Sequence, residues 1–361
     1  MTQTERATAA RKALLAWYRR HQRDLPWRRT RDPYAVWVAE VMLQQTQVAT
    51  VVPYYARFLK RFPTVARLAK APLGAVLKAW EGLGYYGRAR RLHRAAKIVA
   101  GEFGGRLPKT ATELHRLPGI GRYTAGAIAS IAFGRAEPVL DGNVERVLCR
   151  VFRIRRNAKA SATQKRLWRL AQLMVAPGRA GTVNQALMDL GATVCTPRGP
   201  ACGRCPLRRV CSAREHGEQD RLPIRGRRKP VPHYDVPVAV IRKRGRVLID
   251  RRRTEGFLGG LWEFPGGKPE AGESLEACLR REVREELGIG VEVVRPLVTA
   301  RHAYTHFRVT LHAFVCRHTS GRPRAIECAA WTWVTLDELD AYAFPKGSHK
   351  IITALRAREQ T

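Results

Sequence analysis

The first half of the chain shows the spacing of apolar positions that is typical of helices. From about residue 6 to residue 194, apolar residues recur three and four positions apart, and Pro or Gly interrupts the pattern about every ten to twenty residues. Asp32 and Pro33 predict one helix start, with Asp32 as the N-cap and Pro33 in the first turn. Thr110 and Glu113 have capping-box spacing and predict another helix, which runs to Leu117. We expect a mostly helical domain over residues 1–212.

The pattern changes after Cys211. Residues 213–233 are polar, basic and interrupted by Pro, without apolar periodicity, which predicts a linker. The following VPVAVIRKRGRVLIDRR (236–252) predicts two strands around a Lys-Arg-Gly turn. Residues 234–361 are therefore predicted to form a mixed α/β domain, with a helix over 274–287 and further strands near 291–299, 307–316 and 329–334.

Charge narrows the class of partner. The 361 residues hold 66 Lys and Arg against 30 Asp and Glu, a net charge of +36, and such an excess favours a polyanion, with nucleic acid as the leading candidate. The alternative is a general excess of arginine on solvated surfaces. No apolar run approaches the ~20 residues of a membrane span, and the N-terminus lacks the apolar core of a signal peptide. We expect a cytoplasmic protein that does not bind membranes.

Four of the eight cysteines crowd into one short segment. Cys195, Cys202, Cys205 and Cys211 have the spacing C-x6-C-x2-C-x5-C, whereas the other four are scattered. This distribution is unlike a secreted disulfide framework. Four neighbouring thiolates suit either a tetrahedral zinc ion or an iron-sulfur cluster, and the spacing alone does not choose between them.

A glycine-containing turn separates two predicted helices in LPGIGRYTAGAIASIAF (117–133). Gly119 and Gly121 let the backbone come close to a phosphate, and the amides at the next helix N-terminus point towards it. Small residues after the turn allow the second helix to pack closely. The segment resembles the helix-hairpin-helix of DNA-repair glycosylases; the alternative is an ordinary glycine-containing turn between helices.

Two carboxyl groups are candidates for catalysis. Glu40 lies in an otherwise apolar helical segment, where burial should raise its pKa and keep it protonated; the alternative is a structural hydrogen bond. Asp141 follows an apolar run at the start of a helix near Gly142, where it could simply be the N-cap. One carboxylic acid and one carboxylate are the pair that hydrolysis of a glycosidic bond uses.

Six motifs together resemble the MutY family of adenine DNA glycosylases, in the endonuclease III superfamily. They cover most of residues 20–211: LPWR (25–28), EVMLQQTQV (40–48), GLGYYGR (82–88), LPGIGRYTAGAI (117–128), LDGNV (140–144) and NQALMDLGATVC (184–195). The resemblance implies base excision repair, in which adenine mispaired with 8-oxoguanine or guanine is flipped out of the duplex and hydrolysed from its sugar. The implied partner is double-stranded DNA with such mismatches, bound by a monomer at the nucleoid.

The resemblance also assigns roles to single residues. Glu40 is implied to be the general acid, and Asp141 to stabilise an oxocarbenium-like sugar, with help from Tyr123 and Asn143. Tyr123 stands where strand-cutting relatives carry the Lys that forms a Schiff base, so we expect a monofunctional enzyme. The other implied contacts are the wedge residues Gln45 and Tyr85 beside 8-oxoguanine, and Trp27, Arg28, Leu43 and Gln185 near the adenine.

The cysteine loop has a counterpart in the same families. Its position after a helix-hairpin-helix domain resembles their [4Fe-4S] loop, which implies one structural cluster held by the four cysteines of residues 195–211. The cluster would position nearby basic residues for phosphates, namely Arg198, Arg204, Arg208 and Arg209.

The predicted α/β domain contains a complete Nudix signature at residues 267–289, preceded by LWEFPGG (261–267). Glu282, Glu285 and Glu286 fall on one helix face, where magnesium is the usual cation, although we do not expect Mg2+ to be needed here. MutY proteins are similar in using a C-terminal Nudix-like domain to recognise 8-oxoguanine. HAYTHF (302–307) resembles the loop that reads the lesion, with Tyr304, Thr305 and His306 in place of Phe-Ser-His.

Two other functions stay open from the residues. In one, the Nudix domain is the enzyme and hydrolyses an oxidised nucleoside triphosphate, with the helical domain as a DNA anchor. In the other, the chain is a non-catalytic DNA-binding module. The pair Glu40 and Asp141 argues against the second, because such a module needs neither carboxyl group.

Overall fold

The computed structural model describes residues 1–226 and 230–358. The chain divides into two compact units. The first holds Met1–Ala69 and Arg94–Arg228, and the second holds Lys70–His93 and Lys229–Thr361. In the part of the chain that the structure describes, no helix has the length and apolar character to cross a membrane.

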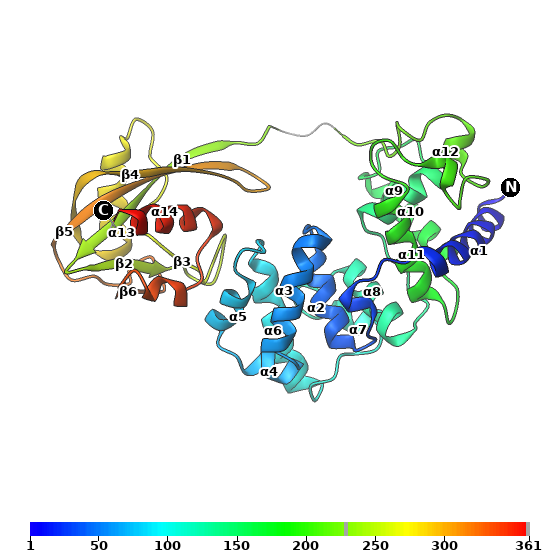
Figure 1. Cartoon of the computed structure of the whole chain (residues 1–361), viewed down its shortest axis with the longest axis horizontal. Coiled ribbons are helices and arrows are strands. Elements are labelled where there is room, and N and C mark those ends of the chain that lie inside the picture. Colours follow the sequence, from blue (N-terminus) through cyan, green and yellow to red (C-terminus); the bar gives the residue numbers. More distant parts are fainter. Residues whose placement is uncertain (227–229, 359–361) are drawn as a thin grey trace. The chain divides into compact units, whose positions relative to one another are not determined.

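The N-terminal two thirds of the chain is helical, as predicted (Figure 1). Its α-helices are α1 (Gln3–His21), α2 (Pro33–Leu43), α3 (Val48–Arg61), α4 (Val65–Lys70), α5 (Leu73–Trp80), α6 (Gly87–Glu102), α7 (Ala111–His115), α8 (Arg122–Phe133), α9 (Gly142–Val151), α10 (Ser161–Met174), α11 (Ala180–Thr193) and α12 (Ser212–Glu215). Two short 3-10 helices, η1 (Pro26–Arg28) and η2 (Cys202–Arg204), lie between them.

Side-chain caps fix two of these helices where the sequence predicts. The Asp32 carboxylate accepts the amides of Tyr34 and Ala35 at the start of α2. Thr110 accepts the amide of Glu113 at 3.3 Å and begins α7. That helix ends at His115, before the predicted Leu117, which directly precedes Pro118 and is therefore disfavoured in helical conformation.

Small residues let helices of the first unit approach closely, and the sequence predicts this for α8. A Cβ added to Gly126 of α8 would lie 2.3 Å from the carbonyl oxygen of Pro138. One added to Gly191 of α11 would lie 2.6 Å from the Cβ of Asn143 at the start of α9. These contacts set the N-terminus of α9 against α11, next to a core that α1, α9, α10 and α11 share.

The start of the predicted linker packs on the first unit. Arg150 Nε donates to the carbonyl of Leu222 at 3.0 Å, the Ala158 amide donates to Ile224 at 2.9 Å, and Arg153 Nε donates to Glu218 at 2.7 Å. Of the predicted linker, residues 213–233, the segment 227–229 lies outside the described residues.

The second unit contains a mixed sheet in the strand order β3-β2-β1-β5-β4, with β6 paired to β2. Strands β1 and β5 are parallel, and Arg244 and Gly245, both with positive φ, turn the chain between β1 and β2. Separate buried clusters pack α13 and α14 on the sheet. The elements are β1 (His233–Lys243), β2 (Arg246–Arg251), β3 (Trp262–Glu263), α13 (Leu275–Leu287), β4 (Gly290–Ala303), β5 (Arg308–Ser320), β6 (Ala330–Val334), η3 (Glu338–Ala341) and α14 (Lys346–Ala357).

Candidate active site

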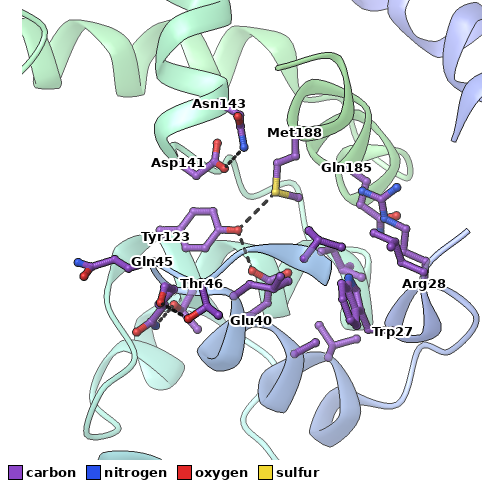
Figure 2. A pocket seen from close by; sticks show the side chains of 18 of the residues that line it. Trp27, Arg28, Glu40, Gln45, Thr46, Tyr123, Asp141, Asn143, Gln185 and Met188 are labelled. Atoms are coloured by element: carbon purple, nitrogen blue, oxygen red, sulfur yellow. Dashed lines mark hydrogen bonds between the residues drawn. The ribbon is translucent and has the colours of Figure 1, made fainter. Parts of the chain in front are cut away.

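A pocket of about 600 Å³ opens in the first unit, and residues far apart in the sequence meet there (Figure 2). Its walls come from η1, α2, the hairpin between α7 and α8, the start of α9, and α11. The sequence-predicted residues that line it are Trp27, Arg28, Glu40, Leu43, Gln45, Gly119, Gly121, Tyr123, Asp141, Asn143 and Gln185.

Glu40 projects from α2, and only 4% of it is exposed. The Tyr123 hydroxyl, from α8, donates a hydrogen bond of 2.7 Å to Glu40 Oε2 (Figure 2). Burial raises the pKa of Glu40 to about 7, and the negative charge of Asp141 adds to that rise, while the hydrogen bond from Tyr123 and the positive charge of Arg28 oppose it. A carboxyl group with this pKa is partly protonated at neutral pH, so it can donate a proton.

Asp141 is both the N-cap of α9 and a wall of the pocket. Its Oδ1 accepts the Val144 amide at 2.7 Å, and its Oδ2 accepts Asn143 Nδ2 at 3.0 Å. Burial raises the pKa of Asp141, whereas these hydrogen bonds and the nearby Arg146 favour its ionised form. Asp141 therefore caps α9 and lines the pocket at the same time, and the start of the helix orients its carboxylate.

Arg28 is held in the pocket wall by an acid that sequence reasoning missed. Asp189 of α11 is completely buried and pairs with both Arg28 and Arg23. Arg28 Nη2 donates to Asp189 Oδ1 at 2.7 Å, and Arg23 Nε donates to the same oxygen at 2.6 Å. A signal was present in the sequence, because Asp189 is the one charged residue in a helix that also carries Gln185 four positions earlier, on the same face.

Met188 is a second pocket residue that the sequence analysis did not identify. Its sulfur lies 3.3 Å from the hydroxyl of Tyr123, on the opposite side from Glu40 (Figure 2). No sequence signal marks it, since a methionine in an apolar helix is ordinarily a core residue.

The hairpin presents a helix N-terminus at the pocket. Gly119 has a φ of 82°, which glycine adopts without strain, and Gly121 is the N-cap of α8. A Cβ added to Gly121 would meet nothing within 4 Å. The backbone amides in the first turn of α8 thus lie next to open space. Such a helix N-terminus is a suitable binding position for an anion.

The structure brings the four cysteines together beside Arg150. They are partly buried and line one small cavity, and Arg150 Nη1 lies 3.3 Å from the sulfur of Cys195. Among the described residues, one group of three metal-ligating side chains has its ligand atoms within 4.8 Å of one another. That group lies in the second unit and includes none of these cysteines. Four thiols around one cavity form a donor set that suits a zinc ion or an iron-sulfur cluster.

The predicted lesion-reading residues lie in the second unit. The hydroxyl oxygens of Tyr85 and Thr305 are 2.5 Å apart, in hydrogen-bond contact. Tyr85 is 42% exposed and has a φ of 52°, and Thr305 and His306 are also exposed. The ring of Tyr304 packs against Phe307 and Phe257, with ring centres 4.9 Å and 5.0 Å away. The structure thus joins Tyr85 to the predicted reading loop.

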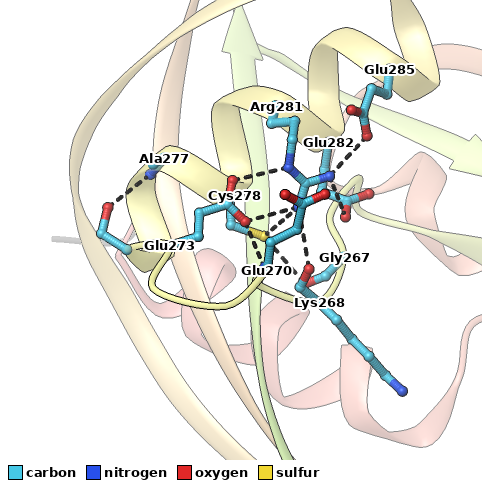
Figure 3. A network of polar contacts seen from close by, with 10 residues as sticks. Gly267, Lys268, Glu270, Glu273, Ala277, Cys278, Arg281, Glu282 and Glu285 are labelled. Atoms are coloured by element: carbon cyan, nitrogen blue, oxygen red, sulfur yellow. Dashed lines mark hydrogen bonds and ion pairs between the residues drawn. The ribbon is translucent and has the colours of Figure 1, made fainter.

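The Nudix glutamates do not gather as the helix spacing predicts, because Arg281 binds two of them. Arg281 Nη1 lies 3.1 Å from Glu282 and 2.9 Å from Glu285, and Nη2 lies 2.9 Å from Glu273 (Figure 3). Glu286 instead accepts the amide of Gly266 at 3.2 Å. A magnesium site made of Glu282, Glu285 and Glu286 is therefore not assembled in this structure.

Comparisons with known domains and folds match both parts of the chain. Residues 38–173 match the family model of the HhH-GPD superfamily of base excision DNA repair proteins, and residues 237–354 match the NUDIX domain. A thermostable thymine-DNA glycosylase is 31% identical, with a TM-score of 0.55 over 59% of this chain and 98% of that protein. A DNA complex of endonuclease III is 22% identical, with a TM-score of 0.52 over 60% of this chain and 99% of that protein, and shows the shared fold.

Curated relatives cover nearly the whole chain. The adenine DNA glycosylase of Homo sapiens is 38% identical over 98% of this chain and 75% of its own length. The adenine DNA glycosylase of Mus musculus is 40% identical over 85% of this chain and 70% of its own length. That of Schizosaccharomyces pombe is 29% identical over 91% of this chain and 86% of its own length. The chain therefore belongs to the MutY family of adenine DNA glycosylases, with an endonuclease III-like helical domain followed by a Nudix-like domain.

Proposed function

We propose that the protein hydrolyses adenine from DNA where adenine is mispaired with 8-oxoguanine or guanine. The observation that carries this proposal is the meeting of Glu40, with a pKa of about 7, and the hydrogen-bonded Asp141 in one pocket of about 600 Å³. A pocket of this size admits a nucleobase, provided that the base first leaves the duplex stack.

The two carboxyl groups divide the reaction between them. Glu40 donates its proton to the adenine, the bond between sugar and base breaks, and its electron pair stays on the departing base. The ionised Asp141, held by Asn143 and the Val144 amide, stabilises the cationic sugar. Water then adds to the sugar and gives up a proton, which leaves an abasic site. Trp27, Arg28, Leu43 and Gln185 surround the base in the same pocket.

Strand cleavage is not part of the proposed activity. A glycosylase that also cuts the strand needs an amine to form a Schiff base with the sugar. None of the residues that line the pocket is a lysine, and Tyr123 hydrogen-bonds Glu40 at the hairpin position.

The second unit would read the base opposite the adenine. Tyr304, Thr305 and His306 form the reading loop, and Tyr85 and Gln45 would enter the base stack. In support, Gln45 and Tyr85 both have left-handed backbones, with φ of 59° and 52°, which non-glycine residues adopt at a cost and which is common at functional positions. The net charge of +36 suits the phosphates of the duplex.

Cys195, Cys202, Cys205 and Cys211 would hold a [4Fe-4S] cluster. When bound, the cluster would fix the loop after α11. Arg150 Nη1 donates to the sulfur of Cys195 at 3.3 Å and to the carbonyl of Thr196 at 2.7 Å, so it holds the start of this loop. Four arginines on this loop are exposed and would meet phosphates, namely Arg198, Arg204, Arg208 and Arg209, although Arg208 Nη1 also donates to the carbonyl of Gly203 at 3.3 Å.

The test is a single-turnover assay without magnesium, with excess protein that carries its full iron content. One duplex holds adenine opposite 8-oxoguanine, and the control holds adenine opposite thymine. We expect adenine release from the first alone, with strand breaks appearing after alkali. Release from both duplexes would contradict mismatch dependence, and breaks before alkali would contradict the monofunctional mechanism. Release from neither, with hydrolysis of 8-oxo-dGTP on adding magnesium, would favour the Nudix domain as the enzyme.

A further inference from the structure

Helix α1 is connected to the pocket of the first unit through one tyrosine. Its buried residues lie three and four positions apart and form a single stripe that faces the core, namely Ala7, Ala10, Leu14 and Tyr18. Tyr18 ends this stripe and is only 4% exposed. Among the described residues, none of those that line the pocket belongs to α1. Any influence of α1 on a bound base must therefore pass through a residue of the pocket wall.

The hydroxyl of Tyr18 contacts such a residue. It donates a hydrogen bond of 2.9 Å to Oε1 of Gln185, on α11. Gln185 and Arg28 both line the pocket (Figure 2). Burial raises the pKa of Tyr18, so its hydroxyl keeps its proton and can donate it to a hydrogen bond. The bond links a helix outside the pocket to a side chain inside it.

This hydrogen bond decides which end of the Gln185 amide is available to a ligand. If the amide were turned over, Nε2 would donate to the tyrosine oxygen, and the buried hydroxyl proton would have no acceptor among the described residues. Burying an unpaired donor costs free energy, so the orientation with Oε1 towards Tyr18 is the stable one. Within the described part of the chain, the Nε2 hydrogens of Gln185 then have no partner and remain available to a ligand.

The neighbouring cation does not compete for this bond. Both Nη atoms of Arg28 bind Asp189, with Nη2 2.7 Å from Oδ1. The Arg28 guanidinium also lies over the ring of Tyr18, 5.8 Å from the ring centre. Asp189 follows Gln185 by four positions on α11, so the two side chains leave the same face of that helix. Two neighbouring polar side chains of the wall are therefore each held by one buried partner.

We propose that Tyr18 is a positioning residue for the flipped base: by holding the Gln185 amide, it directs the Nε2 hydrogens towards a ring nitrogen of adenine. The ring nitrogens of adenine accept hydrogen bonds, so an amide donor suits them. Tyr18 is not among the residues that line the pocket, and it acts through Gln185. This inference rests on the proposed function, because it takes adenine as the base that enters the pocket, and it adds a determinant of how that base is held.

The experiment measures affinity without cleavage, on the full chain with its full iron content. One duplex holds 2′-fluoro-2′-deoxyadenosine opposite 8-oxoguanine, because the electron-withdrawing fluorine disfavours the cationic sugar and so prevents release. The reference duplex holds a tetrahydrofuran abasic analogue at the same position and offers no base to the pocket. Tyr18→Phe removes the hydroxyl and keeps the ring beside Arg28. It should weaken binding of the adenine duplex about fivefold, as loss of one hydrogen bond does, and binding of the reference duplex by less than about twofold.

A double-mutant cycle separates positioning from a general structural effect. In the Gln185→Ala background, Tyr18→Phe should weaken binding of the adenine duplex by less than about a further twofold, because the amide that the hydroxyl holds is gone. Tyr34→Phe is the matched control. Tyr34 is also 4% exposed, and its hydroxyl donates at 2.8 Å to the carbonyl of Phe62, away from the residues that line the pocket. It should bind both duplexes within about twofold of wild type.

Three results would overturn the proposal: unchanged binding of the adenine duplex by Tyr18→Phe, an equal loss on both duplexes, or an undiminished further loss in the Gln185→Ala background. Tyr18→Met is the second variant, should Tyr18→Phe fail to fold, because methionine fills irregular core gaps, and it should show the same selective loss. Failure of the proposed function looks different. Wild type that binds the adenine duplex but releases no adenine from its cleavable counterpart would contradict glycosylase activity, while the binding comparison would still decide the role of Tyr18.

Discussion

The Tyr123 hydroxyl donates to Glu40 at 2.7 Å, and this bond joins the helix after the hairpin to the helix that carries the proposed acid. The bond favours the ionised form of Glu40, while burial favours the protonated form and is the larger effect. The pKa of about 7 is the balance of the two. The position of α8 therefore bears directly on the proton that the proposed reaction uses.

The first prediction concerns pH. A general acid must carry its proton, so the single-turnover rate of adenine release should fall as pH rises through about 7, where Glu40 loses its proton. The rate is measured from pH 5.5 to pH 9 at constant ionic strength, with DNA binding measured in parallel. A rate that rises across this interval while binding stays constant would contradict the role of Glu40.

The second prediction removes the hydrogen bond to the acid. Tyr123→Phe keeps the ring but lacks the hydroxyl that lowers the pKa of Glu40, so the fall in rate should move to higher pH. The same pH series, run on the variant, checks this. Tyr55→Phe serves as a control, since Tyr55 is a buried tyrosine whose ring packs on Trp27 and which is not among the residues that line the pocket. A profile that moves to lower pH in Tyr123→Phe would contradict the arrangement.

The third prediction concerns the buried pair behind the pocket. Asp189→Asn leaves Arg28 without its full counter-charge, and breaking a buried pair typically costs about 3–5 kcal/mol, so the free energy of unfolding should drop by an amount of that order. Asp24→Asn is the matched control, because its pair with Arg29 is 70% exposed on both sides and should change the free energy of unfolding far less. Urea unfolding measures both. Equal effects in the two variants would contradict the structural role of Asp189.

The fourth prediction concerns recognition of the lesion. Tyr85→Phe and Thr305→Val each remove one side of the contact between their hydroxyls. Each should lower the preference for 8-oxoguanine over guanine by about fivefold, the value of a hydrogen bond near 1 kcal/mol, and the double variant should lower it little further. Release rates on the two duplexes provide the ratio. Fully additive losses would show that the two hydroxyls act separately.

Local signals in the sequence predict much of this molecule, because they act within a few residues. The caps at Asp32 and Thr110, the hairpin glycines and the strands around Gly245 all follow from such short-range chemistry. Membership of the family was predicted from motifs that each lie within a single segment, and the comparisons confirm it.

The contacts that sequence reasoning missed depend on residues distant in the chain. Asp189 meets Arg28 across 161 positions, and no local pattern reveals that pairing. The Nudix helix shows the same limit. Spacing places Glu282, Glu285 and Glu286 on one face, but it does not show that Arg281 contacts two of them.

The most direct test of the central claim is single-turnover adenine release by Glu40→Gln on the duplex with adenine opposite 8-oxoguanine, together with its affinity for that duplex. Glutamine keeps the shape of the buried side chain but has no proton to donate. The account predicts that release falls at least about a hundredfold, as expected on removing a general acid, while DNA binding stays within a few-fold of wild type. Release at the wild-type rate would contradict the assignment of Glu40 as the acid.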